Sequence, residues 1–182
     1  IWKDGDDDIY LEQLISLADY IIDNQLWDKY NTTFFSDSIG FKAPDEEIMH
    51  PICGTGNMYC VDADGDIYNC VRFMQYSLNN KSSKKIGDIY DGVNPDKIRP
   101  LKMLLTKYIS DKKCLDCKIN LNCTYCAGNN YDVSENDSMF YRSTATCKMF
   151  KSQVKANNYY WARLYNEQSI CRETKHRHEY FM

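Results

Sequence analysis

The sequence predicts an α+β fold, in which a small core of a β-hairpin and short strands carries cysteine-rich loops and is flanked by N- and C-terminal helices. Three observations predict it. An Asp-Gly pair lies between two apolar runs, which is a strong hairpin signal. Seven of the nine cysteines lie between residues 53 and 126. Apolar residues recur at three- and four-residue steps near both ends of the chain.

The length and composition are those of one globular domain. With 182 residues, 43% of them hydrophobic and 26% charged, the chain is unlike disordered, collagen-like or membrane-embedded proteins. No apolar run approaches the roughly 18 residues of a membrane helix, and no signal segment is visible, so we expect a cytoplasmic protein that binds no membrane. Acidic residues dilute the basic ones, which argues against nucleic acid as a partner. The chain starts at Ile1, and we expect it to be a piece of a longer protein.

The first half of the chain predicts one helix and a hairpin. An amphipathic helix is expected from about Asp6 to about Lys29, because acidic first-turn residues precede the apolar repeat. Residues 31–51 mix Ser, Asp, Gly and Pro with isolated aromatics and are expected to form a loop. Strands over 58–62 and 67–73 then flank an Asp-Gly turn. A short strand is expected over residues 86–89.

The second half predicts two helices around an irregular segment. Pro95 opens a helical pattern that continues through Leu105. Residues 111–131 are rich in cysteine and have no regular period, which predicts an irregular loop shaped by metal. The last helix is expected over residues 144–168. Three aromatic residues of this helix are expected in the core: Tyr159, Tyr160 and Trp161.

The cysteine spacing indicates metal ligation. A CxxC turn aims two thiolates at one point, and zinc and iron-sulfur centres both favour tetrahedral thiolate ligation. Eight cysteines satisfy two four-thiolate sites. A purely local pairing closes one site with Cys114, Cys117, Cys123 and Cys126, and leaves Cys53, Cys60, Cys70 and Cys147 for the other. The ninth cysteine, Cys171, is then expected to be a free thiol.

Other candidate sites have simpler interpretations. Residues 62–66 resemble the start of a calcium loop but lack its sixth-position Gly and twelfth-position Glu, so a turn is expected. His50 is expected to be a solvated loop histidine, while His176 and His178 lie in a basic tail and receive no function. Asn-x-Ser/Thr sequences would fit a secreted disulfide protein, which the odd cysteine number and the missing signal segment disfavour. They occur at Asn31, Asn80, Asn122 and Asn136.

The cysteine pattern resembles that of the SPASM domain, which is appended to radical S-adenosylmethionine (radical SAM) enzymes that modify peptides and proteins. The family's Cys followed by Gly-x4-Cys is matched by Cys53, Gly65 and Cys70. Its Cys-x2-Cys-x5-Cys, with a nearby fourth and a distant fifth Cys, is matched between Cys114 and Cys147. Residues 53–57, 64–70 and 86–89 are also similar to the family. Arg142, Cys147-Lys148-Met149 and residues 156–161 resemble the subgroup that matures ribosomal peptides with Cys-x-x-x repeats.

The resemblance implies two auxiliary 4Fe-4S clusters, the first near the substrate and the second closer to the surface. By position, Cys53, Cys60, Cys70 and Cys126 would hold the first cluster, and Cys114, Cys117, Cys123 and Cys147 the second. Only two residues separate Cys123 from Cys126, where the family usually has three, so the local pairing stays open. We favour the family's pairing, because neighbouring cysteines ligate different clusters in two-cluster ferredoxins. Zinc is expected if the protein is handled in air.

The resemblance also implies a domain organisation and a function. Residues 1–50 would be the terminal helix and linker of a radical SAM barrel, 51–168 the SPASM domain and 169–182 a basic tail. Because the sequence lacks Cys-x3-Cys-x2-Cys, this chain alone is not expected to cleave S-adenosylmethionine. Its expected partners are that barrel and a precursor peptide, cross-linked through a thioether at Cys. The alternatives are an anaerobic sulfatase-maturase-like enzyme, and a non-enzymatic zinc-thiolate module with a structural or interaction role.

Overall fold

The computed structural model describes residues 2–42, 44–51, 53–74, 79–119, 123 and 125–170. Helices and a four-stranded antiparallel sheet confirm the α+β class. The chain divides into two compact units. The helical unit comprises Ile1–Lys42, Lys118–Cys123 and Ala145–Met182, and the sheet unit comprises Ala43–Cys117 and Thr124–Thr144. Over the described residues, no helix has the length and apolar character needed to cross a membrane.

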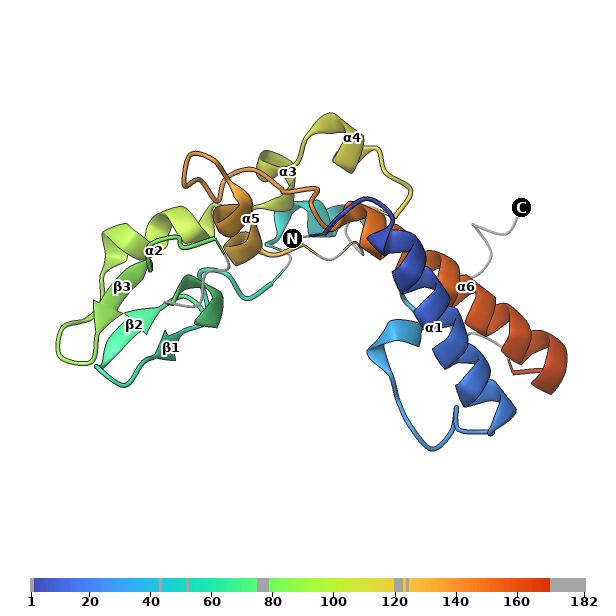
Figure 1. Cartoon of the computed structure of the whole chain (residues 1–182). Helices are drawn as coiled ribbons and strands as arrows, with labels where there is room; N and C mark the ends of the chain where they lie inside the picture. Colours follow the sequence, from blue (N-terminus) through green and yellow to red (C-terminus); the bar gives the residue numbers. More distant parts are fainter. Residues whose placement is uncertain are drawn as a thin grey trace. The chain divides into compact units, whose positions relative to one another are not determined.

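Two helices, α1 (Asp6–Asp23) and α6 (Cys147–Gln168), lie side by side in the helical unit (Figure 1). The α1 residues Leu14, Ala18 and Ile22 are buried at helical spacing, which confirms the predicted amphipathic helix. It ends earlier than the expected Lys29 because the chain turns at Gln25, whose φ is 52°.

The aromatic residues of α6 pack into this core, as predicted. Tyr160 is buried and stacks on Phe35 of the short 3-10 helix η1 (Thr33–Phe35), with ring centroids 4.5 Å apart. Trp161 is partly buried, and its indole Nε1 donates a hydrogen bond to the Phe35 carbonyl at 3.1 Å. Tyr159 also packs against the cluster. Burial of these rings is a sufficient reason for their presence.

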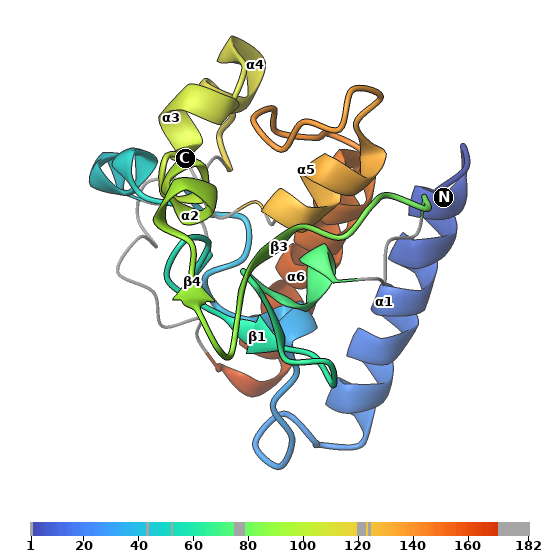
Figure 2. The ribbon, with the colours of Figure 1, turned by 90° about the vertical axis from the view of Figure 1, so that its left-hand side faces the viewer.

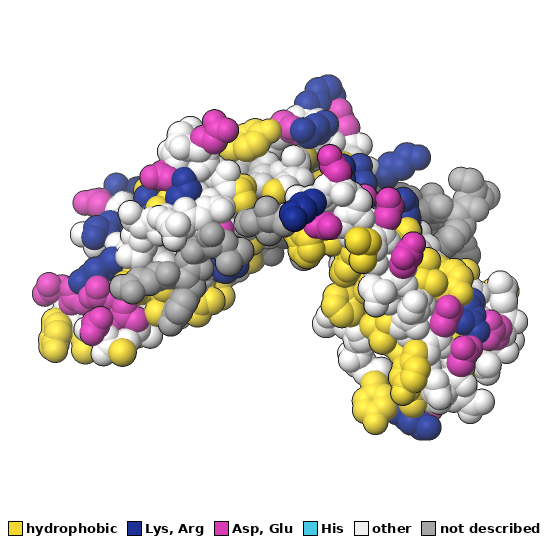
Figure 3. All heavy atoms as spheres, in the orientation of Figure 1, with side chains coloured by type: hydrophobic (Ala, Val, Ile, Leu, Met, Phe, Trp, Pro, Cys, Tyr) yellow, Lys and Arg dark blue, Asp and Glu magenta, His cyan; other side chains and the backbone are white. Residues whose placement is uncertain are grey.

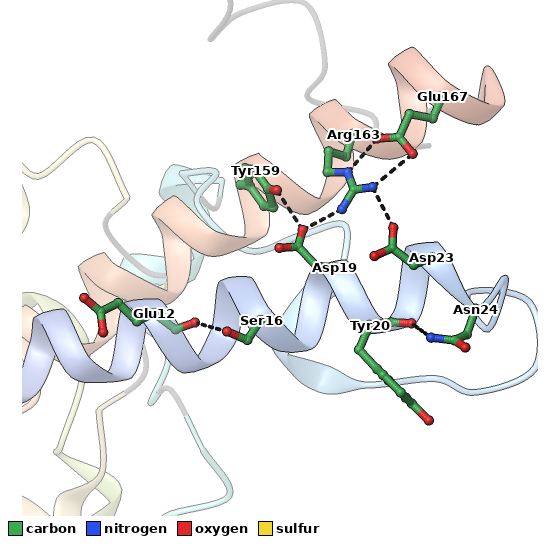
Figure 4. Close-up of polar contacts among 9 residues, drawn as sticks. All are labelled: Glu12, Ser16, Asp19, Tyr20, Asp23, Asn24, Tyr159, Arg163 and Glu167. Atoms are coloured by element: carbon green, nitrogen blue, oxygen red, sulfur yellow. Dashed lines mark hydrogen bonds and ion pairs between the residues drawn. The ribbon is translucent and has the colours of Figure 1, made fainter.

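One arginine joins the two helices through three carboxylates (Figure 4). Arg163 of α6 lies 2.6 Å from Asp19 and 2.8 Å from Asp23, both on α1, and 2.6 Å from Glu167 on its own helix. The Tyr159 hydroxyl donates a 2.7 Å hydrogen bond to the same Asp19 oxygen. The hydrogen bond that Arg163 donates to Glu167, followed by those to Asp23 and Asp19, raises the pKa of Arg163. The acidic residues of the first helix therefore serve in part to bind α6.

Replacing Arg163 by Met should weaken the pairing of α1 with α6, because the change leaves three carboxylates close together with no cation between them. We expect a lower urea midpoint and faster hydrogen exchange in both helices. Lys148→Met is the matched control, since the Lys148–Asp4 pair is a single contact between side chains 68% and 99% exposed. An equal loss of protection in the two variants would show that the three-carboxylate arrangement has no special role.

The sheet unit contains the predicted hairpin and continues it. Its strands are β1 (Cys60–Val61), β2 (Asp66–Tyr68), β3 (Lys85–Asp88) and β4 (Gly92–Val93), antiparallel in that order. Figure 1 labels β1 to β3, and Figure 2 labels β4. Cys60 pairs with Tyr68, and Ile67 pairs with Gly87. The hairpin and the short strand at 86–89 are thus confirmed, with β1 and β2 shorter than expected.

The acidic segment between β1 and β2 is a turn, as predicted. Asp62 Oδ1 accepts hydrogen bonds from the backbone N–H groups of Asp64 at 3.0 Å and Asp66 at 2.9 Å. Lys85 pairs with both Asp66 and Asp88. Figure 3 shows acidic side chains gathered at this end of the sheet unit, at the lower left of the view. The aspartates are therefore accounted for by turn geometry and one lysine.

The remaining elements of the sheet unit are short helices. They are η2 (Asp45–Met49), η3 (Val71–Phe73), α2 (Pro95–Lys102), α3 (Thr106–Ile109), α4 (Lys112–Leu115) and α5 (Ala127–Val133). Nine buried residues form the core: Tyr68, Phe73, Ile86, Ile98, Leu101, Leu104, Ile109, Ala127 and Tyr131. The helix expected from Pro95 through Leu105 is confirmed as α2, but it ends at Lys102 because the backbone is extended at Leu105, and α3 is a separate turn that begins at Thr106.

The expectation of an irregular segment over residues 111–131 is wrong in part. Helix α4 begins where the Asp111 carboxylate accepts the Cys114 N–H at 3.0 Å, which is an N-cap contact. Helix α5 forms because Ala127 and Tyr131, four residues apart, both reach the core. Each of these two helices is only one or two turns long, so the cysteine-rich sequence shows no helical period that would predict them.

Candidate metal centre

The cysteines divide between the two units. Cys53, Cys60, Cys70 and Cys126, the first predicted ligand set, all belong to the sheet unit. Of the second set, Cys114 and Cys117 belong to the sheet unit, and Cys123 and Cys147 to the helical unit. The eight cysteines in the described part of the chain are free thiols. Cys171, His176 and His178 lie outside the described residues, as does most of the predicted tail.

The hairpin positions Cys60 beside the segment that leads to Cys70. Cys60 on β1 stands opposite Tyr68 on β2, and Cys70 follows Tyr68 by two residues. Cys70 is extended and precedes η3, where its carbonyl accepts the Phe73 N–H at 3.0 Å. Both thiols are half-buried and pack against the core of the unit. The antiparallel register therefore brings these two cysteines together.

A tight turn brings Cys53 to the same place. The Gly56 N–H donates a 2.6 Å hydrogen bond to Asn69 Oδ1, on the residue just before Cys70. Gly56 has a φ of 85°, and a Cβ there would lie 3.0 Å from the Lys102 Cα, so glycine is required. The Cys53 Sγ lies 2.7 Å from the Thr55 hydroxyl. Cys53 is exposed, unlike the other three thiols of its set.

Cys126 reaches this region through a close contact between helices. It caps the N-terminus of α5, and its carbonyl accepts the Asn130 N–H at 2.8 Å. Gly128, two residues later, lies so near η3 that an added Cβ would stand 2.4 Å from the Cβ of Arg72. Because Arg72 is two residues after Cys70, this contact fixes the start of α5 beside the Cys70 segment.

A buried hydroxyl ties the segments that precede Cys53 and Cys126. The Thr106 Oγ1 donates to the His50 carbonyl at 3.1 Å and lies 2.9 Å from the Tyr125 hydroxyl, which can then donate to it. Thr106 is buried, so these bonds are shielded from water. His50 itself is exposed, as expected of a solvated loop histidine.

The charge environment of Cys70 reflects this gathering. Burial is the first cause that raises the pKa of the Cys70 thiol, and a hydrogen bond from the Arg72 N–H opposes it. The negative charges of the Cys126, Cys53 and Cys60 thiolates then raise the Cys70 pKa further. Negative charges near Cys70 disfavour its thiolate, and a bound cation would favour it. The cysteines that act on Cys70 are those of the first predicted set, including Cys126.

The donor set fits a thiolate-bound metal centre in chemistry, although the thiols do not yet converge. Within the described ranges, no three His, Cys, Asp or Glu side chains stand where they could hold a metal ion. Protonated thiols have no reason to converge, because ligand deprotonation and metal binding occur together. Ligation by these four cysteines therefore stays a prediction.

The four cysteines of the second predicted set are divided between the two units. Cys114 and Cys117 form the expected CxxC turn, with the Cys117 N–H donating to the Cys114 carbonyl at 3.3 Å. Burial raises the pKa of Cys114, as does its contact with Asp111. Since Cys123 and Cys147 belong to the other unit, the structure gives no geometry for these four cysteines as a set.

Arg142 is a buried cation beside the cysteine segments. The spacing of the cysteines did not single out this residue. It is 4% exposed, its guanidinium lies 4.3 Å from the centre of the Tyr125 ring, and its Nη1 lies 3.4 Å from the Ser110 hydroxyl. Its charge favours the thiolate of Cys114 and so partly opposes the rise in that pKa. The sequence carried no signal of this role beyond the likeness already noted around Arg142.

Comparisons with known proteins found no protein-family model, no curated protein and no solved structure that matches the chain significantly.

Gly128→Ala should destabilise the sheet unit by about 1–3 kcal/mol through overpacking against Arg72. This sign is informative, because Gly-to-Ala changes inside helices usually stabilise by roughly 0.5–1 kcal/mol. Urea unfolding with hydrogen exchange over residues 125–133 would measure it. Gly54→Ala is the control, since its new Cβ would meet only the flexible Met58 side chain, at 3.2 Å. A Gly128→Ala variant as stable as the parent would refute the close approach.

Proposed function

We propose that this chain is the auxiliary iron-sulfur domain of a longer radical SAM enzyme that modifies ribosomally made peptides. The observation that carries the proposal is the gathering of Cys53, Cys60 and Cys126 about Cys70 from separate segments. Cys126 lies more than 50 residues beyond Cys70, so a metal site formed only by cysteines close together in the sequence would not combine these two. This is the set that the resemblance to SPASM domains requires.

The polypeptide would hold one 4Fe-4S cluster with Cys53, Cys60, Cys70 and Cys126, and a second with Cys114, Cys117, Cys123 and Cys147. Bound clusters of this kind accept and pass on single electrons. The half-buried thiols Cys60, Cys70 and Cys126 form the inner side of the first set, and the exposed Cys53 forms its open side. A peptide substrate would approach the first set from the side of Cys53.

The reaction of the parent enzyme would be thioether formation. One hydrogen atom is abstracted from a peptide carbon by the barrel, and a Cys sulfur of the peptide then bonds to that carbon with loss of one proton and one electron. The electron needs an acceptor, and the contribution of this domain is to hold that acceptor and to orient the peptide. The proposed clusters need reduced cysteine thiols, which the cytoplasm maintains, so we propose a cytoplasmic location.

Anaerobic reconstitution of the chain with ferrous iron and sulfide should give a brown protein with about eight irons. Replacing Cys70 and Cys126 together by Ser should leave about half of this iron, because both would belong to one site. Replacing Cys114 and Cys126 together should remove nearly all of it, because each would belong to a different site. Iron analysis and the visible spectrum measure both results.

The same variants discriminate between the two pairings. If one site were formed by Cys114, Cys117, Cys123 and Cys126, the results for the two double variants would be exchanged. Cys171→Ser is the control and should keep all of the iron. A colourless protein with stoichiometric zinc after anaerobic reconstitution would instead favour the non-enzymatic zinc module.

The full-length enzyme should convert a Cys-repeat precursor peptide into a product lighter by two hydrogens, with one Cys that resists alkylation. Mass spectrometry before and after alkylation measures this, and unreacted precursor without S-adenosylmethionine is the control. A product that forms a hydrazone would indicate formylglycine, as in sulfatase maturation. Cleavage of S-adenosylmethionine with an unmodified precursor would contradict the thioether assignment.

A further inference from the structure

Asn69 carries a buried amide group whose N–H bonds are unused. The residue is 1% exposed, and its Oδ1 accepts the Gly56 N–H at 2.6 Å. Its Nδ2 is buried and has no hydrogen-bond partner in the part of the chain that the structure describes. The donor Gly56 N–H fixes which side-chain atom is the oxygen, so the unused group is the NH2.

An unused NH2 group at this depth is costly. Removing such a donor from water without a partner costs about 1–3 kcal/mol, and native proteins seldom retain one without a reason. A common reason is a bound group that supplies the missing acceptor. The carboxamide of Asn69 therefore calls for an acceptor that the described polypeptide does not provide.

The position of Asn69 indicates which acceptor that is. It precedes Cys70 directly, it follows Tyr68, which pairs with Cys60, and its oxygen is bonded to the turn that begins at Cys53. The amide is thus held among three of the four segments that carry the first set. No cysteine Sγ of the described residues accepts from the Asn69 Nδ2, but those segments carry Cys53, Cys60 and Cys70, and a cluster held by them would supply sulfur as the acceptor.

Two other buried asparagines with an unused atom differ from Asn69. Asn157 uses its Nδ2 on the Phe34 and Ser36 carbonyls, at 3.4 and 2.8 Å, and its unused atom is the acceptor Oδ1. Asn130 accepts the Ser143 N–H at 2.9 Å and has an unused Nδ2, one helical turn after Cys126. Only Asn69 is bonded directly to a second cysteine-bearing segment of the first set.

We propose that the Asn69 Nδ2 donates a hydrogen bond to a sulfur atom of the cluster held by Cys53, Cys60, Cys70 and Cys126. This inference rests on the proposed function. A hydrogen bond to sulfur stabilises the more negative, reduced state, so Asn69 raises the reduction potential of the first cluster. Asn69 is a positioning residue in this account, because it acts through the cluster and not on a substrate.

The test compares Asn69→Asp and Asn69→Leu with the parent chain after anaerobic reconstitution with iron and sulfide. Asn69→Asp keeps an oxygen for the Gly56 N–H, and Asn69→Leu removes the donor without adding charge. We expect both variants to keep about eight irons. One of the two cluster signals, followed by electron paramagnetic resonance in a redox titration, should move to lower potential. Asn157→Asp, a change at a buried asparagine of the helical unit, should move neither.

A second measurement begins with the parent chain, in which the expected contact can be detected directly. Parent chain labelled with ¹⁵N in the asparagine side chains should show a nitrogen hyperfine coupling to one reduced cluster, and Asn69→Asp should lose it. Full iron content with unchanged potentials, or a coupling lost only in Asn130→Asp, would overturn the proposal for Asn69 and leave the proposed function intact. A parent chain that takes up zinc and no iron would overturn both.

Discussion

The contact between Gly128 and Arg72 is the constraint on which the first cysteine set depends. It is the place where α5, which starts at Cys126, meets η3, which starts after Cys70. Helix α5 contributes Ala127 and Tyr131 to the core, so the energy of core packing holds Cys126 in place. A larger side chain at position 128 would force the two segments apart, whatever the cysteines bind.

The other contacts of this region serve the same gathering but use polar groups. Asn69, Thr106 and Tyr125 are linked to segments that are distant in sequence, through the Gly56 N–H, the His50 carbonyl and the Thr106 hydroxyl. Buried hydrogen bonds of this kind specify one arrangement more strictly than apolar packing does, because each lost partner is costly. The segments that carry Cys53, Cys70 and Cys126 are therefore held near one another by contacts of the polypeptide itself.

The two units are stabilised in different ways. The helical unit relies on the apolar faces of α1 and α6 and on Arg163, which joins carboxylates of both helices. The sheet unit has short strands and short helices around nine buried core residues. Small thiolate domains of that kind gain much of their folding energy from the bound group. If the sheet unit binds the proposed clusters, its folding and its cluster binding would depend on each other.

The sequence by itself determined the features that depend on neighbouring residues. Asp-Gly predicted the hairpin, helical periodicity predicted α1 and α6, and CxxC predicted the turn at Cys114. Only the tertiary structure decided that the segments of Cys53, Cys60 and Cys126 lie near that of Cys70, that α5 lies within the cysteine-rich segment, and that Asn69 and Arg142 are buried. These features depend on contacts between residues far apart in the chain, and spacing records no such contact. Local pattern therefore predicted the elements, and long-range packing selected the partners.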